Sequence, residues 1–280
     1  MITPKATLFF CAALLGLSAA GSSAAPMLSQ DLEYQRAPKV LGNDAPRVGE
    51  WILNLEFAVL GGGRSSFEEV AGERGLVVVM RDPECPLSKK YSPRLRELES
   101  EAQKMGLPFL YVGMESEEAA QGDVKLYGLS STYAVDPDGH IARELDARTS
   151  TEVFVIDSAN TMAYRGMIDD QYGLGFSKAM AEHYYLVDAM ENVRDGQHVA
   201  IPATTAQGCK LQIEAGERGE RELTYHNRIS RIVQDSCTTC HRAGEAGPFE
   251  LTNYKQVNKR RSMIAWALED HVMPPWFASE

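Results

Sequence analysis

The residues of this 280-residue chain that are best suited to chemistry are four of its five cysteines, which fall into two groups; Cys11 lies in the apolar N-terminal run and is set aside. Cys85 lies in the stretch ECPLSKKYSPRLREL, and Cys209 lies far downstream in TTAQGCKLQI. Cys237 and Cys240 stand together in DSCTTCHRAGEAGPFEL, where His241 follows directly. Thiols can act as nucleophiles, pair as disulfides or bond to cofactors. The two groups therefore predict two separate sites.

The downstream group has the spacing CxxCH. Two thiols three residues apart at the end of a helix can add to the two vinyl groups of one porphyrin, and the adjacent histidine can ligate its iron. We therefore expect one covalent haem c per chain, held by Cys237, Cys240 and His241. A reducible CxxC disulfide is an alternative. A zinc half-site is disfavoured, because no second Cys/His pair has a suitable spacing.

Residues 225–280 resemble a small class of c-type cytochrome domains. The resemblance lies in CxxCHR at 237–242, Gly-Pro-Phe at 247–249 and MPPW at 273–276. It implies a small all-α cytochrome c-like domain in which Met273 is the sixth ligand of the haem iron.

Two other residues compete with Met273 for that position. Met263 shares helical spacing with Val257 and Ala267, which predicts a place in the core. His271 lies in the polar stretch LEDH, which predicts a solvated helix end. Met273 is therefore the expected ligand.

Cys85 follows an apolar run, GLVVVM at 75–80, that predicts a buried parallel strand, and it precedes a helical pattern. The positive end of the helix dipole, with Lys89 and Lys90 nearby, favours the thiolate. The flanking residues at 82–86 predict an exposed turn. The alternative is a small buried apolar residue, which is the usual state of a free cysteine.

Residues 45–200 resemble thioredoxin-like proteins of the redoxin type. The matches are the strand before Cys85, the Cys-Pro turn into a helix, Pro93 inside that helix, and the strand pair in EVFVIDSANTMAYRG. The resemblance implies an α/β domain with a central mixed sheet flanked by helices. It also implies activity with a redox partner protein.

Three positions depart from the redoxin pattern. Ser88 replaces the second active-site cysteine, so the ordinary dithiol is missing. Thr151 stands where these proteins usually have a cis-proline, which leaves substrate docking open. Asp82 stands where peroxiredoxins place a threonine, which argues against a dedicated peroxiredoxin.

Cys209 is the candidate for the missing partner of Cys85. Related redoxin–cytochrome proteins carry a similar Gly-Cys-x-hydrophobic stretch after their last helix. A cysteine on such a tail could reach back to Cys85 as a resolving thiol, or it could be an isolated thiol in a loop. Asp169 and Asp170, in RGMIDDQYG, also match the related proteins; they could orient the tail or bind a cation, but paired acids at a strand end are usually solvated turn residues, and they are assigned no role.

The remaining patterns divide the chain into three parts. Residues 1–25 have the layout of a secretory signal peptide, residues 26–215 are expected to form the thioredoxin-like domain, and residues 216–280 are the haem-binding segment. The expected elements are a capped helix start from Ser65 to Glu68, strands at 75–80 and 107–114, a helix from Tyr91, paired strands within 152–166 and a helix at about 177–194.

Charge and composition restrict the possible partners and the location. A net charge of −11 without a basic tract disfavours nucleic acid and anionic membranes as partners. After the leader no apolar run is long enough to span a bilayer, so we expect no membrane span. The leader predicts a protein that is periplasmic or otherwise exported.

Two hypotheses on function follow. The first is an exported haem-containing oxidoreductase that couples a thiol or disulfide at Cys85 to one-electron transfer at the haem. Because a disulfide needs two electrons, this coupling requires a second acceptor or two encounters. The second is an electron-carrier cytochrome whose thioredoxin-like domain is a redox-inactive docking scaffold.

Overall fold

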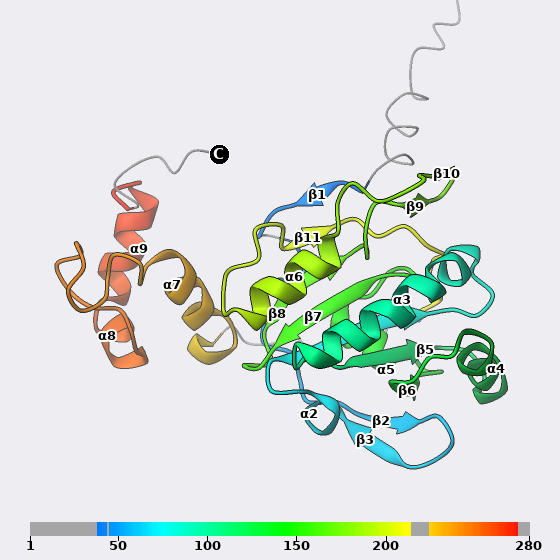
Figure 1. Ribbon diagram of the computed structural model, residues 1–280. Coiled ribbons are helices and arrows are strands. Elements are labelled where there is room, and N and C mark those ends of the chain that lie inside the picture. Colours follow the sequence, from blue (N-terminus) through cyan, green and yellow to red (C-terminus); the bar gives the residue numbers. More distant parts are fainter. Residues whose placement is uncertain (1–37, 44, 214–223, 274–280) are drawn as a thin grey trace, which may run out of the picture.

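The computed structural model describes residues 38–43, 45–213 and 224–273 (Figure 1). The expected signal peptide at 1–25 lies outside these ranges, as does the end of the MPPW motif from position 274 onward. Within the described part, the main element is a mixed sheet of nine strands. In spatial order these are β1 (Val40–Leu41), β11 (Ala203–Thr204), β8 (Met162–Gly166), β7 (Val153–Asp157), β4 (Gly75–Arg81), β5 (Phe109–Gly113), β6 (Thr132–Val135), β2 (Glu56–Val59) and β3 (Arg64–Ser66).

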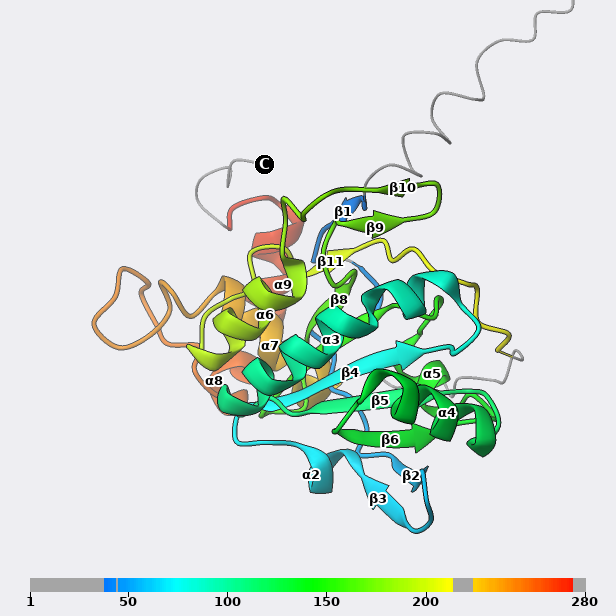
Figure 2. The ribbon, with the colours of Figure 1, turned by 45° about the vertical axis from the view of Figure 1, so that its right-hand side comes forward.

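Helices cover both faces of this sheet (Figures 1 and 2). One face is packed by α3 (Pro86–Lys104), α4 (Glu117–Tyr127) and α6 (Tyr185–Arg194), and the other by α2 (Phe67–Val70) and α5 (His140–Leu145). A small hairpin of β9 (Tyr172–Gly173) and β10 (Phe176–Ser177) stands apart from the sheet.

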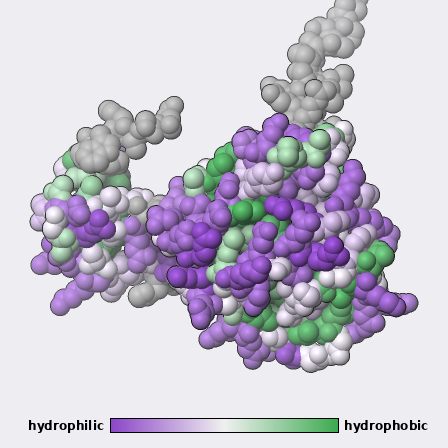
Figure 3. Space-filling model, in the orientation of Figure 1, coloured by the Kyte–Doolittle hydropathy of each residue, from purple (hydrophilic) through white to green (hydrophobic). Residues whose placement is uncertain are grey.

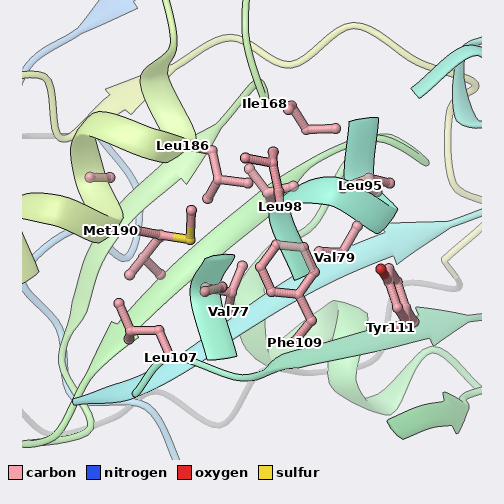
Figure 4. Packing of buried hydrophobic residues seen from close by; sticks show 14 of the residues in the cluster. Val77, Val79, Leu95, Leu98, Leu107, Phe109, Tyr111, Ile168, Leu186 and Met190 are labelled. Atoms are coloured by element: carbon pink, nitrogen blue, oxygen red, sulfur yellow. The ribbon is translucent and has the colours of Figure 1, made fainter. Parts of the chain in front are cut away.

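The central strand β4 is buried along its whole length, as its apolar run predicts. Its side chains alternate between the two faces because successive residues of a strand point in opposite directions. Val77 and Val79 pack with α3 and α6, as Figure 4 shows, whereas Val78 and Met80 pack with the residues of α2 and α5. The core therefore holds β4 rigidly from both sides.

Strand β4 runs between two opposite ends of the domain. Its last residue, Arg81, leads to Cys85, while its first residue, Gly75, pairs with Asp157 at the turn between β7 and β8. Seven residues of β-strand extend over about 20 Å. What lies at the β7–β8 turn is thus about a strand length away from the Cys85 turn.

Most of the elements expected from the sequence are present. Strands β4, β5, β7 and β8 and helix α3 lie where the patterns predict them, and Pro93 is inside α3. The expected cap is displaced by one residue, because Ser66 and Glu69 form the capping box of α2. The predicted helix at 177–194 begins only at Tyr185, since the residues before it form β10 and a loop.

The described part of the C-terminal segment is helical. It consists of a π-helical turn (Tyr225–Ile229), α7 (Ser230–Ser236), α8 (Tyr254–Lys259) and α9 (Arg261–Glu269). Its small core contains Val233, Leu251 and Val257. Met263 was expected in that core but is 44% exposed, because α9 buries none of its side chains.

None of the helices in the described ranges combines the length and the apolar character needed to cross a membrane.

Candidate functional site

Cys85 lies between β4 and α3, at the N-cap position of the helix, with Pro86 at the first helical position. The turn is fixed by Asp82, whose backbone carbonyl accepts from the Cys85 amide at 3.1 Å and whose carboxylate accepts from the Glu84 amide at 2.8 Å. The sequence predicts an exposed turn, but Cys85 is only 1% exposed. Other parts of the chain must therefore cover it.

A buried ion pair holds the start of α3 against the end of β4. The Arg81 guanidinium binds both carboxylate oxygens of Asp123 in α4, the shorter contact being 2.7 Å, and both side chains are excluded from solvent. Arg81 also donates to the Ser88 carbonyl at 2.9 Å and to the Ser92 hydroxyl at 3.1 Å. Its planar group thus fixes the first turn of the helix that carries Cys85.

Residues 207–211 form the cover over Cys85, and we call them the strap. They run antiparallel to residues 148–151, with the Ser150 amide donating to the Cys209 carbonyl at 3.0 Å and the Leu211 amide to the Arg148 carbonyl at 3.0 Å. The two segments approach closely at Gly208, where a Cβ atom would meet the Thr151 hydroxyl at 3.0 Å. Figures 1 and 2 show this yellow segment running to the end of the sheet where α3 begins.

The strap brings Cys209 to Cys85. Both sulfurs and a carboxylate oxygen of Asp82 lie within 4.8 Å of one another, and neither cysteine is in a disulfide. Ser150 links the parts, because its hydroxyl accepts from the Cys209 amide at 3.1 Å and its carbonyl accepts from the Ser88 hydroxyl at 2.8 Å. The structure therefore places side by side the two thiols that the sequence suggests as partners.

The two thiols differ in acidity. Burial raises the pKa of Cys85, but hydrogen bonds from the Cys209 thiol and the Ser150 hydroxyl, with backbone groups of Ser88 and Cys209, outweigh burial and lower the pKa overall. The same contact with Cys85, together with burial, raises the pKa of Cys209 to about 11. Cys85 is thus the more acidic of the two thiols, and Cys209 is the less acidic one.

The lysines expected to favour the thiolate have other contacts. The Lys89 ammonium lies 3.8 Å from the Glu84 carboxylate, and that of Lys90 lies over the ring of Tyr172, 5.7 Å from its centre. Hydrogen bonds rather than these charges set the acidity of Cys85. The role of Ser150 could not be predicted from the sequence, although its neighbour Thr151, in the same loop, was identified there.

Asp169 and Asp170 hold a loop together. Asp169 is buried and accepts from the Tyr91 hydroxyl at 2.8 Å, and burial raises the pKa of its carboxyl. Asp170 pairs with the Lys178 ammonium at 2.7 Å and accepts from the His183 amide at 3.0 Å. Their contacts account for both acids as structural residues.

The CxxCH motif occupies the end of α7 and the loop after it. His241 is buried, and its Nδ1 lies 2.9 Å from the Phe249 carbonyl. Since a carbonyl only accepts, Nδ1 carries the proton and Nε2 keeps its lone pair. Gly247 is required here, because a Cβ would lie 2.7 Å from the His241 ring. Burial raises the pKa of Cys237.

Met273 lies at the end of the described chain and is 37% exposed, with its amide donating to the Ala267 carbonyl at 3.0 Å. His271, the other rival, is also exposed and has a positive φ of 54°. Neither exposure nor backbone geometry decides between these two residues and Met263, and the axial ligand stays a prediction.

The two cysteine groups lie at opposite ends of the sheet. Arg231 lies in α7, and its guanidinium donates to the Thr161 hydroxyl at 2.9 Å and to the Ala159 carbonyl at 3.2 Å, both in the β7–β8 turn. Arg228 adds a hydrogen bond to the Val48 carbonyl at 2.7 Å. In Figure 1 these helices accordingly lie on the left, and the beginning of α3 lies on the right.

Comparisons with known proteins agree with the observed fold. Residues 48–165 match the AhpC/TSA family. A hypothetical protein from Sinorhizobium meliloti 1021 is 20% identical with a TM-score of 0.56, covering 65% of this chain and 100% of its own. An uncharacterized conserved protein from Geobacillus kaustophilus is 18% identical with a TM-score of 0.54, covering 61% of this chain and 94% of its own.

No curated protein matches this chain. At such low sequence identity, the likeness to these two solved structures shows the fold alone. With the sheet order, they show a thioredoxin-like α/β fold, and residues 48–165 of that fold are similar to the AhpC/TSA family.

Proposed function

We propose that this protein is an exported thiol–disulfide oxidoreductase in which Cys85 is the nucleophile and Cys209 the resolving thiol, and that its C-terminal segment carries one covalent haem c. The observation that carries the thiol part is the placement of the two sulfurs within 4.8 Å, with a lowered pKa on one and a raised pKa on the other. Such a difference is what a nucleophile and its proton-bearing partner require.

The exchange would proceed in two steps. The Cys85 thiolate attacks one sulfur of a disulfide in a partner protein, a mixed disulfide forms, and the second sulfur of the partner leaves as a thiolate. Cys209 then loses its proton and attacks the Cys85 sulfur, which releases the first partner sulfur. Two electrons pass to the partner, and the chain keeps a Cys85–Cys209 disulfide that must be reduced by a later donor.

The burial of Cys85 makes the strap part of this mechanism. A partner sulfur can reach Cys85 only when the strap shifts, because Cys85 is 1% exposed. Cys209 lies on that strap, so a shift of the strap that exposes Cys85 also moves the resolving thiol away from it. When the strap returns, Cys209 can attack the mixed disulfide at Cys85. Residues 148–151 would guide the return through their hydrogen bonds.

The residues of the C-terminal segment fit a haem. Cys237 and Cys240 would form the thioether bonds, and His241 would offer Nε2 to the iron while its Nδ1 stays hydrogen-bonded to the Phe249 carbonyl. Met273 would be the sixth ligand. The attached haem would supply transfer of one electron at a time.

The segment also exposes the apolar surface that such a group would cover. The exposed large apolar side chains from α8 onward are Tyr254, Met263, Trp266, Leu268, Val272 and Met273. Figure 3 shows apolar atoms, in green, on this smaller lobe of the molecule. Small protein units rarely expose so many large apolar side chains together, and a haem would cover part of this surface.

The position of the two sites favours indirect coupling. Because about one strand length separates the Cys85 turn from the β7–β8 turn that α7 contacts, we propose that a partner protein carries electrons between the two sites. The same distance, with the burial of Cys85, supports the alternative of an electron-carrier cytochrome with an inert docking domain.

Thiol reactivity tests the proposal and its alternative. In the reduced full chain at neutral pH, iodoacetamide should modify Cys85 faster than Cys209 once the strap opens, and mild oxidation should join the two peptides in a mass map. Cys209→Ser is the matched control, which should yield no such peptide. A reduced chain whose Cys85 resists both alkylation and oxidation would favour the electron-carrier function.

A further inference from the structure

The cluster at the strap contains more than two thiols. Asp82, Cys85 and Cys209 each offer one ligand atom, and these three atoms lie within 4.8 Å of one another. They come from the strand end, the helix start and the strap, which are distant in sequence. The fold therefore gathers a carboxylate and two sulfurs around one point.

Each of the three ligands is held by independent contacts. The Asp82 carboxylate accepts from the amides of Glu84 and Cys85, at 2.8 and 3.3 Å, which orients it across the helix start. Cys85 is fixed by the N-cap geometry of α3. Cys209 is fixed from both sides of its peptide by Ser150, whose hydroxyl accepts from the Cys209 amide and whose amide donates to the Cys209 carbonyl. The donor set is thus preorganised by the backbone.

We propose that in the reduced protein Asp82, Cys85 and Cys209 bind a thiophilic divalent cation of the zinc class. Binding exchanges the two thiol protons for one cation: both sulfurs become thiolate ligands, the carboxylate is the third ligand, and water fills the fourth position. No oxidation or reduction takes place in this step.

The donor set selects the class of metal. Zn²⁺ accepts thiolate sulfur at about 2.3 Å and carboxylate oxygen at about 2.0–2.2 Å, which in a tetrahedron puts ligand atoms somewhat less than 4 Å apart. The observed separations, at most 4.8 Å, require only small side-chain rotations. Ca²⁺ and Mg²⁺ demand oxygen ligands throughout and are excluded by two sulfurs.

Access and charge also suit a cation. Asp82 and Cys209 are only partly buried, so an ion can enter from their side although Cys85 is covered. Asp82 and Glu84 lie near Glu115, and after burial the charges of these two carboxylates help to raise the pKa of the Glu115 carboxyl. A site with excess negative charge is one that a divalent cation relieves.

The metal and the disulfide exclude each other, because both use the same sulfur atoms. The bound cation would keep the two thiols reduced and unavailable, and formation of the Cys85–Cys209 disulfide would expel it. Metal binding by the reduced thiols does not depend on the proposed exchange with a partner disulfide. A chain that binds zinc but never forms the disulfide would therefore support this inference and contradict the proposed function.

Calorimetric titration with Zn²⁺ alone tests the site. The full chain carries Cys237→Ser and Cys240→Ser, so that the CxxC thiols contribute nothing, and is kept reduced. We expect one Zn²⁺ per chain, with protons released on binding. Zn²⁺ should also protect Cys85 and Cys209 from iodoacetamide.

Single substitutions in that background identify the ligands. Cys85→Ser and Cys209→Ser should each weaken binding by about a hundredfold or more, and Asp82→Asn by about tenfold. Glu84→Gln, a neighbouring acid that is not a ligand, should leave the affinity within about threefold. Far-UV circular dichroism checks that each variant is folded.

Four results would overturn the proposal, and the first three concern binding itself. These are no binding at micromolar Zn²⁺ in the reduced chain, binding that survives in the folded Cys209→Ser variant, and equal binding after Cys85 and Cys209 have been joined by oxidation. A loss with Glu84→Gln as large as that with Asp82→Asn would also overturn it, since it would mark a diffuse charge effect.

Discussion

At the end of the sheet that holds Cys85, the chain itself covers the reactive groups, whereas the C-terminal helices expose several large apolar side chains. Arg81 and the strap satisfy the first site with hydrogen bonds and an ion pair. The second has a core of three buried apolar residues and a helix, α9, with none. The first site is closed by the polypeptide itself, whereas the second leaves large apolar side chains exposed.

The thiols at these two sites also differ in the direction in which their pKa values are shifted. Hydrogen bonds lower the pKa of Cys85, while burial alone raises that of Cys237. The comparison leads to four tests, which start with the largest effect.

The largest expected difference between the two cysteine groups is in covalent attachment of haem. In a host with a cytochrome c maturation system, the variant with Cys237→Ala and Cys240→Ala should lose all covalent haem, seen as loss of the haem-staining band on a denaturing gel. The variant with Cys85→Ala and Cys209→Ala is the matched control and should keep the band. Haem that survives the first double substitution contradicts the assignment.

The sixth ligand is tested next. The oxidised haem protein should show a thioether–iron charge-transfer band near the red end of its spectrum, and Met273→Ala should abolish it. Met263→Ala should leave it intact, although Met263 is similarly exposed. The opposite pattern would assign the role to Met263, and persistence of the band in both would point away from any methionine.

The ion pair under Cys85 should matter for stability. Arg81→Met leaves the Asp123 carboxylate buried without its partner and should lower the free energy of unfolding by about 3–5 kcal/mol. Arg64→Met is the control, because its pair with Glu56 is exposed, and the loss should be below about 1 kcal/mol. Urea denaturation followed by circular dichroism measures both. Equal losses would mean that Arg81 does not anchor the site.

Sequence patterns predicted the fold well where local signals are strong. The apolar run of β4 and the helical spacing of α3 identify their elements, because continuous burial and a 3.6-residue period leave few alternatives. They placed the start of α6 too early, at 177, since the signals of a loop and a short strand at that point are weak.

The site was only partly predictable. Cys85 and Cys209 could be named from the sequence, but the burial of Cys85 could not, because the covering strap pairs with residues distant in sequence. The polar residues and prolines that flank Cys85 in the sequence suggest an exposed turn, because they carry no information on segments that pack from elsewhere in the chain. Ser150 was missed for the same reason, since a serine acquires its role only through the segments packed against it.

The smallest expected effect concerns the interaction between the two thiols. The contact with Cys85 is the largest cause of the raised pKa of Cys209, about 11, so Cys85→Ser should lower that pKa toward the usual value of about 8.5. At mildly alkaline pH the Cys209 thiolate, and with it the rate of alkylation, should rise by up to about a hundredfold. Cys237, in the haem-free chain, is the internal control and should not change.

The pH dependence of the free energy of unfolding tests the same interaction between Cys85 and Cys209. A thiol whose folded pKa is raised stabilises the folded state fully below its unfolded pKa, and this contribution is lost as the pH rises from about 8.5 through about 11. The lowered pKa of Cys85 acts oppositely, adding stability as the pH rises toward the unfolded value. Wild-type stability should therefore decline between about pH 8.5 and 11, and Cys85→Ser should flatten that decline. An unchanged decline, together with unchanged alkylation of Cys209, would show that the two thiols act independently.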